Sequence, residues 1–116
     1  MNDCVFCKII KGEMPSTKVF EDEEMVAFKD INPMAPVHVL IVPKIHFSSL
    51  VDATDEKQAL LGKLLLKARD LAKELDVADA GYKLVINNGK DSGQIVFHLH
   101  VHLLGGWKDG KGNKNY

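Results

Sequence analysis

Three histidines at alternate positions, His98, His100 and His102, are the residues of this sequence best suited to chemistry. In a β-strand successive side chains point to opposite faces, so these imidazoles would share one face and leave the aliphatic residues between them on the other. A neutral imidazole, with an ordinary pKa near ~6.5, is a good nucleophile toward phosphorus and leaves readily from the phosphohistidine that it forms. Neighbouring imidazoles can donate hydrogen bonds to phosphoryl oxygens and move protons. The middle residue, His100, has a neighbour on each side and is therefore predicted to be the nucleophile.

The row of histidines also has three interpretations that involve no catalysis. The histidines could be solvated polar residues on an exposed strand face, although three of the chain's five histidines in register are hard to ascribe to packing alone. Two of them could bind one zinc ion, but the first and third lie roughly 13 Å apart at ~3.3 Å per residue and cannot share it. The row could also bind phosphate without turnover.

Both cysteines of the chain lie in the segment Cys4-Val5-Phe6-Cys7. In a reducing compartment such a pair is either half of a metal site or a redox pair. A redox pair requires a preceding βαβ unit, which the few residues before the motif cannot supply. A metal site requires two further ligands, for which the histidines are the candidates.

The size and charge of the chain limit what it can be. With 116 residues it is long enough for one hydrophobic core and short for two, so residues 1–116 are predicted to form a single domain. A formal charge of −1 gives no reason to expect nucleic acid or an anionic membrane surface as a partner. No apolar run approaches the ~20 residues that span a bilayer, and the N-terminus does not resemble a signal peptide. We therefore expect a cytoplasmic protein.

The order of the elements predicts an α+β domain, in which an antiparallel sheet carries its helices on one face. A short helix is expected at Val5–Ile10 and one long amphipathic helix at Asp55–Leu75, with Thr54 as its N-cap. Hydrophobic patterning predicts five strands, at residues 17–21, 24–29, 37–42, 82–87 and 96–104. Residues 107–116 are expected to form a flexible tail.

Several motifs, taken together, resemble the Hint branch of the histidine-triad (HIT) superfamily. The triad itself, His98-x-His100-x-His102-Leu-Leu, is one of them, and the others occur in the family's order with closely similar spacing. They are Phe6-x-Lys-Ile-Ile, Val26-Ala-Phe-x-Asp-Ile-x-Pro, Pro36-x-His-x-Leu-Ile-Val-Pro-Lys-x-His46, Leu61-Gly62 and Gly93-Gln-x-Val-x-His98. The resemblance covers about residues 4–106 and implies a HIT-like fold. In that fold the five-stranded sheet pairs with that of a second copy, so that a homodimer has one ten-stranded sheet.

The resemblance also implies an activity, hydrolysis of the P–N bond of purine nucleoside 5′-phosphoramidates such as adenosine 5′-monophosphoramidate, through a nucleotidyl-histidine intermediate and without an organic cofactor. By the same resemblance His100 attacks the α-phosphorus and His102 binds the phosphate. His38 and His98 complete the active-site histidines, and Asp30 matches the carboxylate that accepts hydrogen bonds from the ribose hydroxyls. The positions that match the other nucleotide-binding residues are Val5, Phe6, Ile9, Phe28, Ile31, Asn87 and Gly93.

A structural zinc site is implied as well, because some bacterial members of the superfamily bind zinc through matching residues. Here these are Cys4, Cys7, His46 and His98, a Cys2His2 set that would tie the N-terminus to the sheet. With zinc on His98, that histidine would organise the site rather than donate a proton. The two thiols could instead be free, as in members that share the Leu-Leu-Gly-Gly ending of the motif.

Two residues depart from the family pattern. Ile95 stands where many members have a serine that helps the leaving group, and Trp107 follows Gly106 directly where relatives have a basic residue. Both departures concern the amine side of the substrate. Two further functions stay open: hydrolysis of dinucleoside polyphosphates, which the Leu-Leu-Gly-Gly ending disfavours, and a purine-nucleotide-binding interaction module with incidental turnover.

Overall fold

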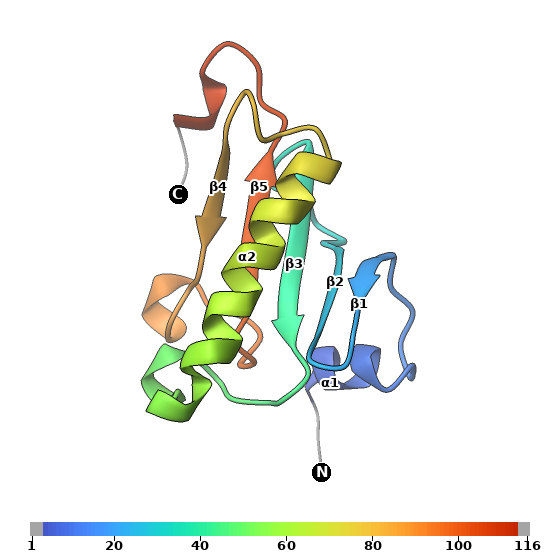
Figure 1. Ribbon diagram of the computed structural model, residues 1–116, viewed down its shortest axis with the longest axis vertical. Helices are drawn as coiled ribbons and strands as arrows, with labels where there is room; N and C mark the ends of the chain where they lie inside the picture. Colours follow the sequence, from blue (N-terminus) through green and yellow to red (C-terminus); the bar gives the residue numbers. More distant parts are fainter. Residues whose placement is uncertain (1–3, 114–116) are drawn as a thin grey trace.

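The computed structural model describes residues 4–113 of the chain (Figure 1). The α-helices of this part are α1 (Val5–Ile10) and α2 (Gln58–Glu74). Five strands form one antiparallel sheet in the order β1-β2-β3-β5-β4. They are β1 (Lys18–Glu21), β2 (Met25–Lys29), β3 (Val37–Pro43), β4 (Tyr82–Val85) and β5 (Val101–Gly105). The predicted α+β fold, with a five-stranded antiparallel sheet, one short helix and one long helix, is confirmed.

The two helices cover opposite faces of the sheet, so the prediction that both pack on one face is wrong. Figure 1 shows α2 lying across one face, where its Leu64 joins a buried cluster with Ile41 and Leu103. A second buried cluster on the other face joins Phe6 of α1 to Leu40 of β3. The reason lies in the central strands, because nearly every residue of β2 and β3 is buried. A strand that is apolar on both sides needs a cover on both sides.

Strand β5 begins at Val101, later than the predicted start at residue 96. Val101 pairs with Ile41, so a continued ladder would place Leu99, two residues earlier, opposite Pro43. A proline has no N–H to donate, so the ladder stops before this pair. The N–H of Leu99 donates instead to the carbonyl of Phe47 at 2.7 Å. The alternation of faces survives outside the ladder, since Leu99 is buried in the same cluster as Val101.

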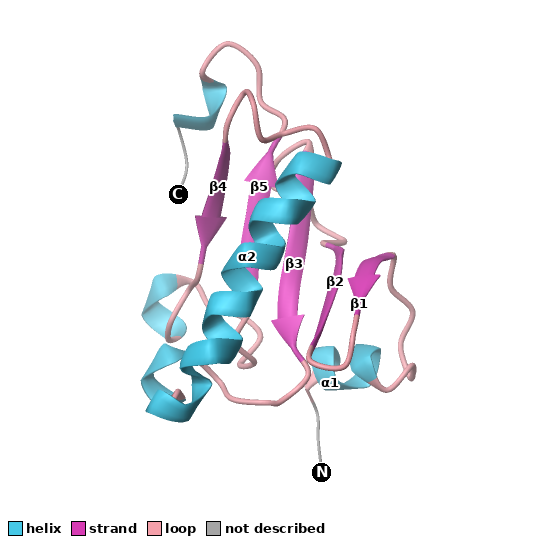
Figure 2. Cartoon of the chain, in the orientation of Figure 1, coloured by secondary structure: helices cyan, strands magenta, loops and turns pink. Residues whose placement is uncertain are grey.

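Two other predicted boundaries also shift by more than one residue. Helix α2 begins at Gln58, because residues 55–57 form a 3-10 turn in which the side chain of Thr54 makes no capping hydrogen bond. Short 3-10 turns are common at helix N-termini. Strand β4 ends at Val85, whereas its predicted end is Asn87. The connection to β5 starts after Val85 (Figure 2). The periodicity of the long helix predicts an apolar stripe of Leu61, Leu64, Ala68, Leu71 and Leu75. The structure buries Leu64, Ala68 and Leu71 of this stripe, together with Leu60 and Ala72, whereas Leu61 and Leu75 are only half-buried.

After β5 the chain folds back beside β4. The Nζ atom of Lys83 lies 5.6 Å from the centre of the Trp107 ring. Gly112 packs on the same ring so closely that an added Cβ would lie 2.4 Å from its Cε3 atom. The predicted flexible tail also includes residues 114–116, which lie outside the described residues, and its flexibility stays a prediction. Within residues 4–113 no helix is both long enough and apolar enough to cross a membrane.

Candidate functional site

A cavity of about 380 Å³ opens on the face of the sheet that α1 covers. Its volume falls within the roughly 300–1,000 Å³ of typical small-ligand sites. The structure brings together here all the residues that the sequence assigned to nucleotide binding: Val5, Phe6, Ile9, Phe28, Asp30, Ile31, Asn87 and Gly93. The side chains of His38, His100 and His102 line the same cavity. An apolar wall and three imidazoles therefore face one space.

A hydrogen bond to the backbone fixes the tautomer of His100. Its Nδ1 lies 2.7 Å from the carbonyl oxygen of His98, and because a carbonyl only accepts, Nδ1 must carry the proton. In the neutral ring Nε2 then has a free lone pair. The ring of Phe6 packs edge to face against this imidazole, with 4.9 Å between the ring centres and an interplanar angle of 87°. His100 is thus held in one orientation, with Nδ1 as a donor and Nε2 as an acceptor.

Hydrogen bonds also set the tautomers of His38 and His102. The backbone N–H of Met34 donates to Nδ1 of His38 at 3.0 Å, so this nitrogen carries no proton. Nε2 of His38 is therefore protonated and donates to Nδ1 of His102 at 2.9 Å. In neutral His102 the proton then lies on Nε2. The hydrogen bonds from Met34 to His38 and from His38 to His102 therefore make Nε2–H of His102 a donor in the wall of the cavity.

Burial keeps the cavity histidines neutral at pH 7. Burial, with smaller contributions from His100 and His38, lowers the pKa of His102 to about 4. Burial likewise lowers the pKa of His100 and of His38 below 6.5. The hydrogen bond to the His98 carbonyl and then the Asp30 carboxylate oppose this shift at His100, and Asp30 opposes it at His38. An oxygen of that carboxylate lies 3.5 Å from Nε2 of His38. Because only the neutral imidazole has a lone pair, these shifts keep His100 competent for attack near neutral pH.

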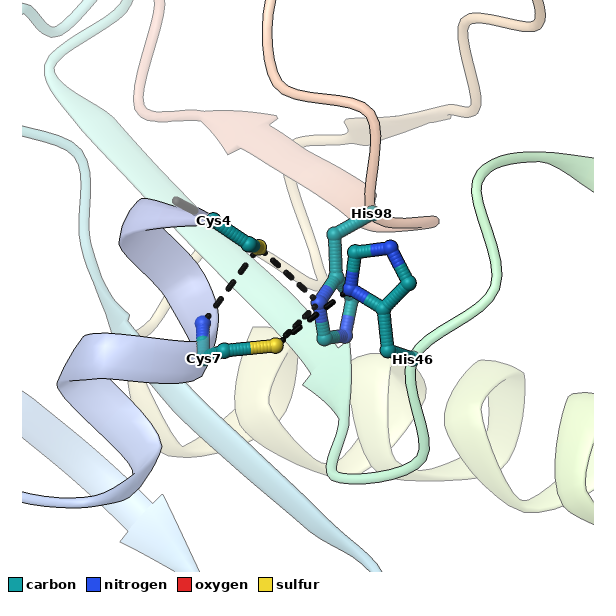
Figure 3. A group of neighbouring side chains, drawn as sticks. All are labelled: Cys4, Cys7, His46 and His98. Atoms are coloured by element: carbon teal, nitrogen blue, oxygen red, sulfur yellow. Dashed lines mark hydrogen bonds between the residues drawn. The ribbon is translucent and has the colours of Figure 1, made fainter. Parts of the chain in front are cut away.

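His98 does not line the cavity, and its side chain meets Cys4, Cys7 and His46 instead (Figure 3). The sulfur atoms of Cys4 and Cys7 lie 3.4 Å and 3.6 Å from Nδ1 of His98. The sulfur of Cys7 also lies 3.3 Å from Nδ1 of His46. All four ligand atoms lie within 4.8 Å of one another. The cysteines come from the start of α1. His46 lies just after β3, and His98 lies just before β5.

The donor set and its geometry fit a zinc ion. In a tetrahedral site with Zn–S bonds of ~2.3 Å and Zn–N bonds of ~2.1 Å, sulfur and nitrogen ligands lie about 3.6 Å apart, close to the distances above. Nε2 of His98 donates to the carbonyl of Pro43 at 2.7 Å, so Nδ1 is unprotonated and directed at the thiols. Burial lowers the pKa of His98 to about 4, which leaves this ring neutral, whereas burial raises the pKa of the Cys4 thiol.

Two residues that shape the site were not assigned a role from the sequence. Met34 acts through its backbone N–H on His38, and no side-chain pattern marks a backbone donor. Gln94 is buried, and its amide joins three segments: it accepts from the N–H of Gly89 at 2.7 Å and donates to the carbonyls of Ser48 at 2.6 Å and Val96 at 3.0 Å. The sequence signal that could have identified Gln94 is its position directly before the apolar run 95–97. An amide in such a place is often buried, and a buried amide needs hydrogen-bond partners.

The chain is similar to known proteins over most of its length. The HIT domain family matches residues 11–109. Protein HitA of Neisseria gonorrhoeae is 54% identical over 105 residues, which cover 90% of this chain and 97% of HitA. A solved HIT family hydrolase from Clostridium thermocellum superposes with a TM-score of 0.91 at 49% identity, and the match covers 95% of this chain and 96% of that one.

The names of two further solved structures describe a ligand. A Zn-bound histidine triad family protein from Mycobacterium smegmatis has a TM-score of 0.80 at 34% identity, covering 94% of this chain and 78% of its own. A histidine triad nucleotide-binding protein from Candida albicans has a TM-score of 0.78 at 41% identity, with 87% and 73% covered. Because the HIT domain pattern matches residues 11–109 and HitA is 54% identical over nearly its whole length, this chain belongs to the HIT domain family.

Proposed function

We propose that the chain is a nucleotide-binding hydrolase that cleaves the P–N bond of purine nucleoside 5′-phosphoramidates, such as adenosine 5′-monophosphoramidate. The observation that carries this proposal is His100, a buried and neutral imidazole whose Nδ1–H is held by a carbonyl and whose Nε2 is free to attack. The proposal is supported by the relatives that are named as a hydrolase and as a nucleotide-binding protein.

The cavity has a place for each part of such a substrate. Phe6 and Phe28 meet edge to face, 5.4 Å between ring centres, and with Ile9 they form an apolar wall suited to a purine. One carboxylate oxygen of Asp30 accepts from the N–H of Asn32 at 2.8 Å, which orients the group as an acceptor for ribose hydroxyls. His102 offers an N–H to a phosphate oxygen.

The reaction then runs in two steps. Nε2 of His100 attacks the α-phosphorus, the P–N bond to the amine breaks, and the amine leaves with a proton from solvent. Donation from Nε2–H of His102 stabilises the negative charge on the phosphoryl oxygens. Water next attacks the nucleotidyl-histidine, which breaks the bond to His100, releases a proton to solvent and yields the nucleoside 5′-monophosphate.

The test is to incubate the protein with adenosine 5′-monophosphoramidate and to stop the reaction with base at early times, because acid hydrolyses a P–N bond to histidine. We expect release of ammonia and AMP, and a peptide that carries an adenylyl group on His100 in mass spectrometry. Faster turnover of diadenosine polyphosphates would favour the polyphosphate hydrolase instead. Tight AMP binding with negligible turnover of several phosphoramidates would favour an interaction module.

We propose that Cys4, Cys7, His46 and His98 hold one structural zinc ion. When bound, the ion would cross-link α1 to the sheet, because four protein ligands leave no position open for substrate. The purified wild-type protein is expected to contain about one zinc ion per chain by atomic emission, and Cys7→Ser is expected to lose most of it. The matched control is His102→Asn, a buried histidine outside the set, which should keep its zinc. A metal-free wild type after growth with zinc would contradict the assignment.

We also propose that the protein forms a homodimer through β4. This strand is last in the sheet order, so its outer edge meets no other strand within residues 4–113. Such an edge is ready to pair with its symmetry mate, and a two-fold axis there would make one ten-stranded sheet. Leu84 of β4 is 37% exposed and would be covered in that arrangement.

Light scattering at micromolar concentration is expected to give twice the mass of the chain. Leu84→Lys should shift the equilibrium toward monomer, because two lysines would face each other near the two-fold axis. Met14→Lys, an exposed residue close to the far edge of the sheet, is the control and should remain dimeric. A wild type with monomer mass would exclude this assembly.

The pKa of His102 predicts how stability depends on pH. The native residue has a pKa of about 4, whereas in the unfolded chain the ordinary value of 6.5 applies. Between these values the unfolded state binds more protons, so the free energy of unfolding falls as the pH is lowered from 6.5 toward 4. Urea denaturation across this range is expected to show a shallower fall for His102→Asn than for the wild type. Parallel slopes for the two proteins would contradict the assigned shift.

We propose the cytoplasm as the location of the protein, because thiol ligands persist in a reducing compartment. Fractionation of cells that express the chain, with detection by antibody, would test this.

A further inference from the structure

Helix α1 contributes to the cavity and to the cysteine–histidine cluster at the same time. Cys4 caps its N-terminus and Cys7 lies in its first turns, whereas Phe6 and Ile9 line the cavity. The helix has six residues, which is too short to be stable by itself. Its attachment to the sheet therefore depends on a few side chains, the buried Phe6, Cys7 and Ile9 above all.

Phe6 is the first link between the two sites, because it lies between the two cysteines in the sequence. Its ring contacts that of His100 with 4.9 Å between centres, and that of His98 with 5.9 Å. It also packs on Phe28 across the cavity wall. A change in how the cysteines are held would therefore move a ring that touches both the purine wall and the nucleophile.

His98 is the second link. Its side chain is fixed at both nitrogens, by the carbonyl of Pro43 and by the two thiols. Its main-chain carbonyl accepts the hydrogen bond that sets the tautomer of His100. One residue thus belongs to the metal cluster through its ring and to the nucleophile through its backbone.

We propose that Cys4, Cys7 and His46 are positioning residues for the nucleotide cavity, and that a metal ion bound by them and His98 raises the affinity of the cavity for a purine nucleotide. This inference rests on the proposed nucleotide binding. Without the ion, the contacts of the thiols with His98 and His46 are weak, and α1 is docked only part of the time. If the cavity is complete in only a fraction of the molecules, the apparent affinity for the ligand is the intrinsic affinity multiplied by that fraction. Metal bonds that keep α1 docked would restore the intrinsic affinity.

The proposal has a strict thermodynamic consequence. If zinc raises the affinity for AMP by some factor, AMP must raise the affinity for zinc by the same factor. Calorimetry with AMP on zinc-loaded and chelator-treated protein gives the first factor. Competition with a chromogenic chelator, with and without saturating AMP, gives the second. We expect both to be about tenfold, within the usual range of coupling between sites.

The variant His46→Ala separates the metal from the helix, because it removes one ligand and leaves α1 and His98 intact. It is expected to bind AMP as weakly as the chelated wild type and to show no response to zinc. Ile45→Ala, at the exposed neighbouring position, is the matched control and should keep the full response. Circular dichroism of the chelated wild type and of His46→Ala checks that α2 and the sheet remain folded in both proteins.

Equal AMP affinities with and without zinc would overturn the proposal, as would a wild type that binds no zinc. If AMP binds to neither form, the proposed nucleotide function fails, and nuclear magnetic resonance of the His100 ring then decides the coupling. A zinc-dependent shift of the His100 Nδ1–H signal in the absence of nucleotide would support it. An unchanged signal would refute it.

Discussion

Replacement of His100 by asparagine is expected to lower kcat for adenosine 5′-monophosphoramidate by at least about 10⁴-fold, as is typical when a nucleophile is removed. Asparagine has an amide N–H that can still donate to the carbonyl of His98, so the local backbone is retained. It has no lone pair able to form a bond to phosphorus. Steady-state kinetics with detection of AMP provides the measurement.

A matched variant distinguishes loss of the nucleophile from loss of a hydrogen-bond donor. His102→Asn removes the ring Nε2–H that is proposed to stabilise the phosphoryl oxygens. Loss of a single such donor typically lowers kcat by about 10²–10³-fold. Both variants should still bind AMP in calorimetry, because the apolar wall of Phe6 and Phe28 is unchanged. Comparable turnover by His100→Asn and the wild type would remove His100 from the mechanism. Loss of AMP binding in both variants would indicate a structural effect instead.

The substitution Leu64→Ala in α2 is expected to lower the free energy of unfolding by about 3 kcal/mol. Leu64 is fully buried, 0% exposed, in the cluster that joins α2 to β3 and β5. Truncation would leave a cavity that the neighbouring residues fill only in part. For a domain of this size we expect a fall in Tm of roughly 10 °C, measured by calorimetry or by circular dichroism.

The control for Leu64→Ala is the same substitution at Leu66, two residues along the same helix and 53% exposed. Helix propensity changes equally in both variants, so the difference between them isolates burial. Leu66→Ala is expected to change the free energy of unfolding by less than about 0.5 kcal/mol. Equal effects at the two positions would mean that α2 does not cover the sheet as described.

The proposed function makes different demands on the two helices. α2 supplies stability from the face of the sheet that has no part in the cavity, whereas α1 is short and its residues line the cavity directly. A segment with few buried contacts opens more easily than the core. A bound zinc ion would hold α1, the less stable of the two helices, and not the core under α2. We therefore expect the ion to change nucleotide affinity more than the global free energy of unfolding.

Much of the fold follows from patterns that are local in the sequence. The predicted short helix has the bounds of α1, Val5–Ile10. The long helix and the five strands occur where their periodicity predicted them. The predicted start of β5 was wrong, because it is decided by Pro43 on the strand that lies opposite. The faces covered by the helices were wrong because helix spacing does not specify which side of a sheet a helix packs on.

The sequence by itself determined which residue types are available for chemistry: the histidine row, the cysteine pair and the acid at position 30. The equal spacing of the three histidines could not divide them into two sites, and before the structure only the family resemblance set His98 apart. The tertiary structure supplies the physical reason, because α1 places Cys4 and Cys7 beside His98, more than ninety residues away along the chain. It also set the tautomers of His100 and His102, since the carbonyl and imidazole that fix them become partners through backbone geometry and strand pairing. Spacing along a chain predicts which face a side chain points to, whereas the contacts that give it a tautomer and a charge state depend on how the backbone is folded around it.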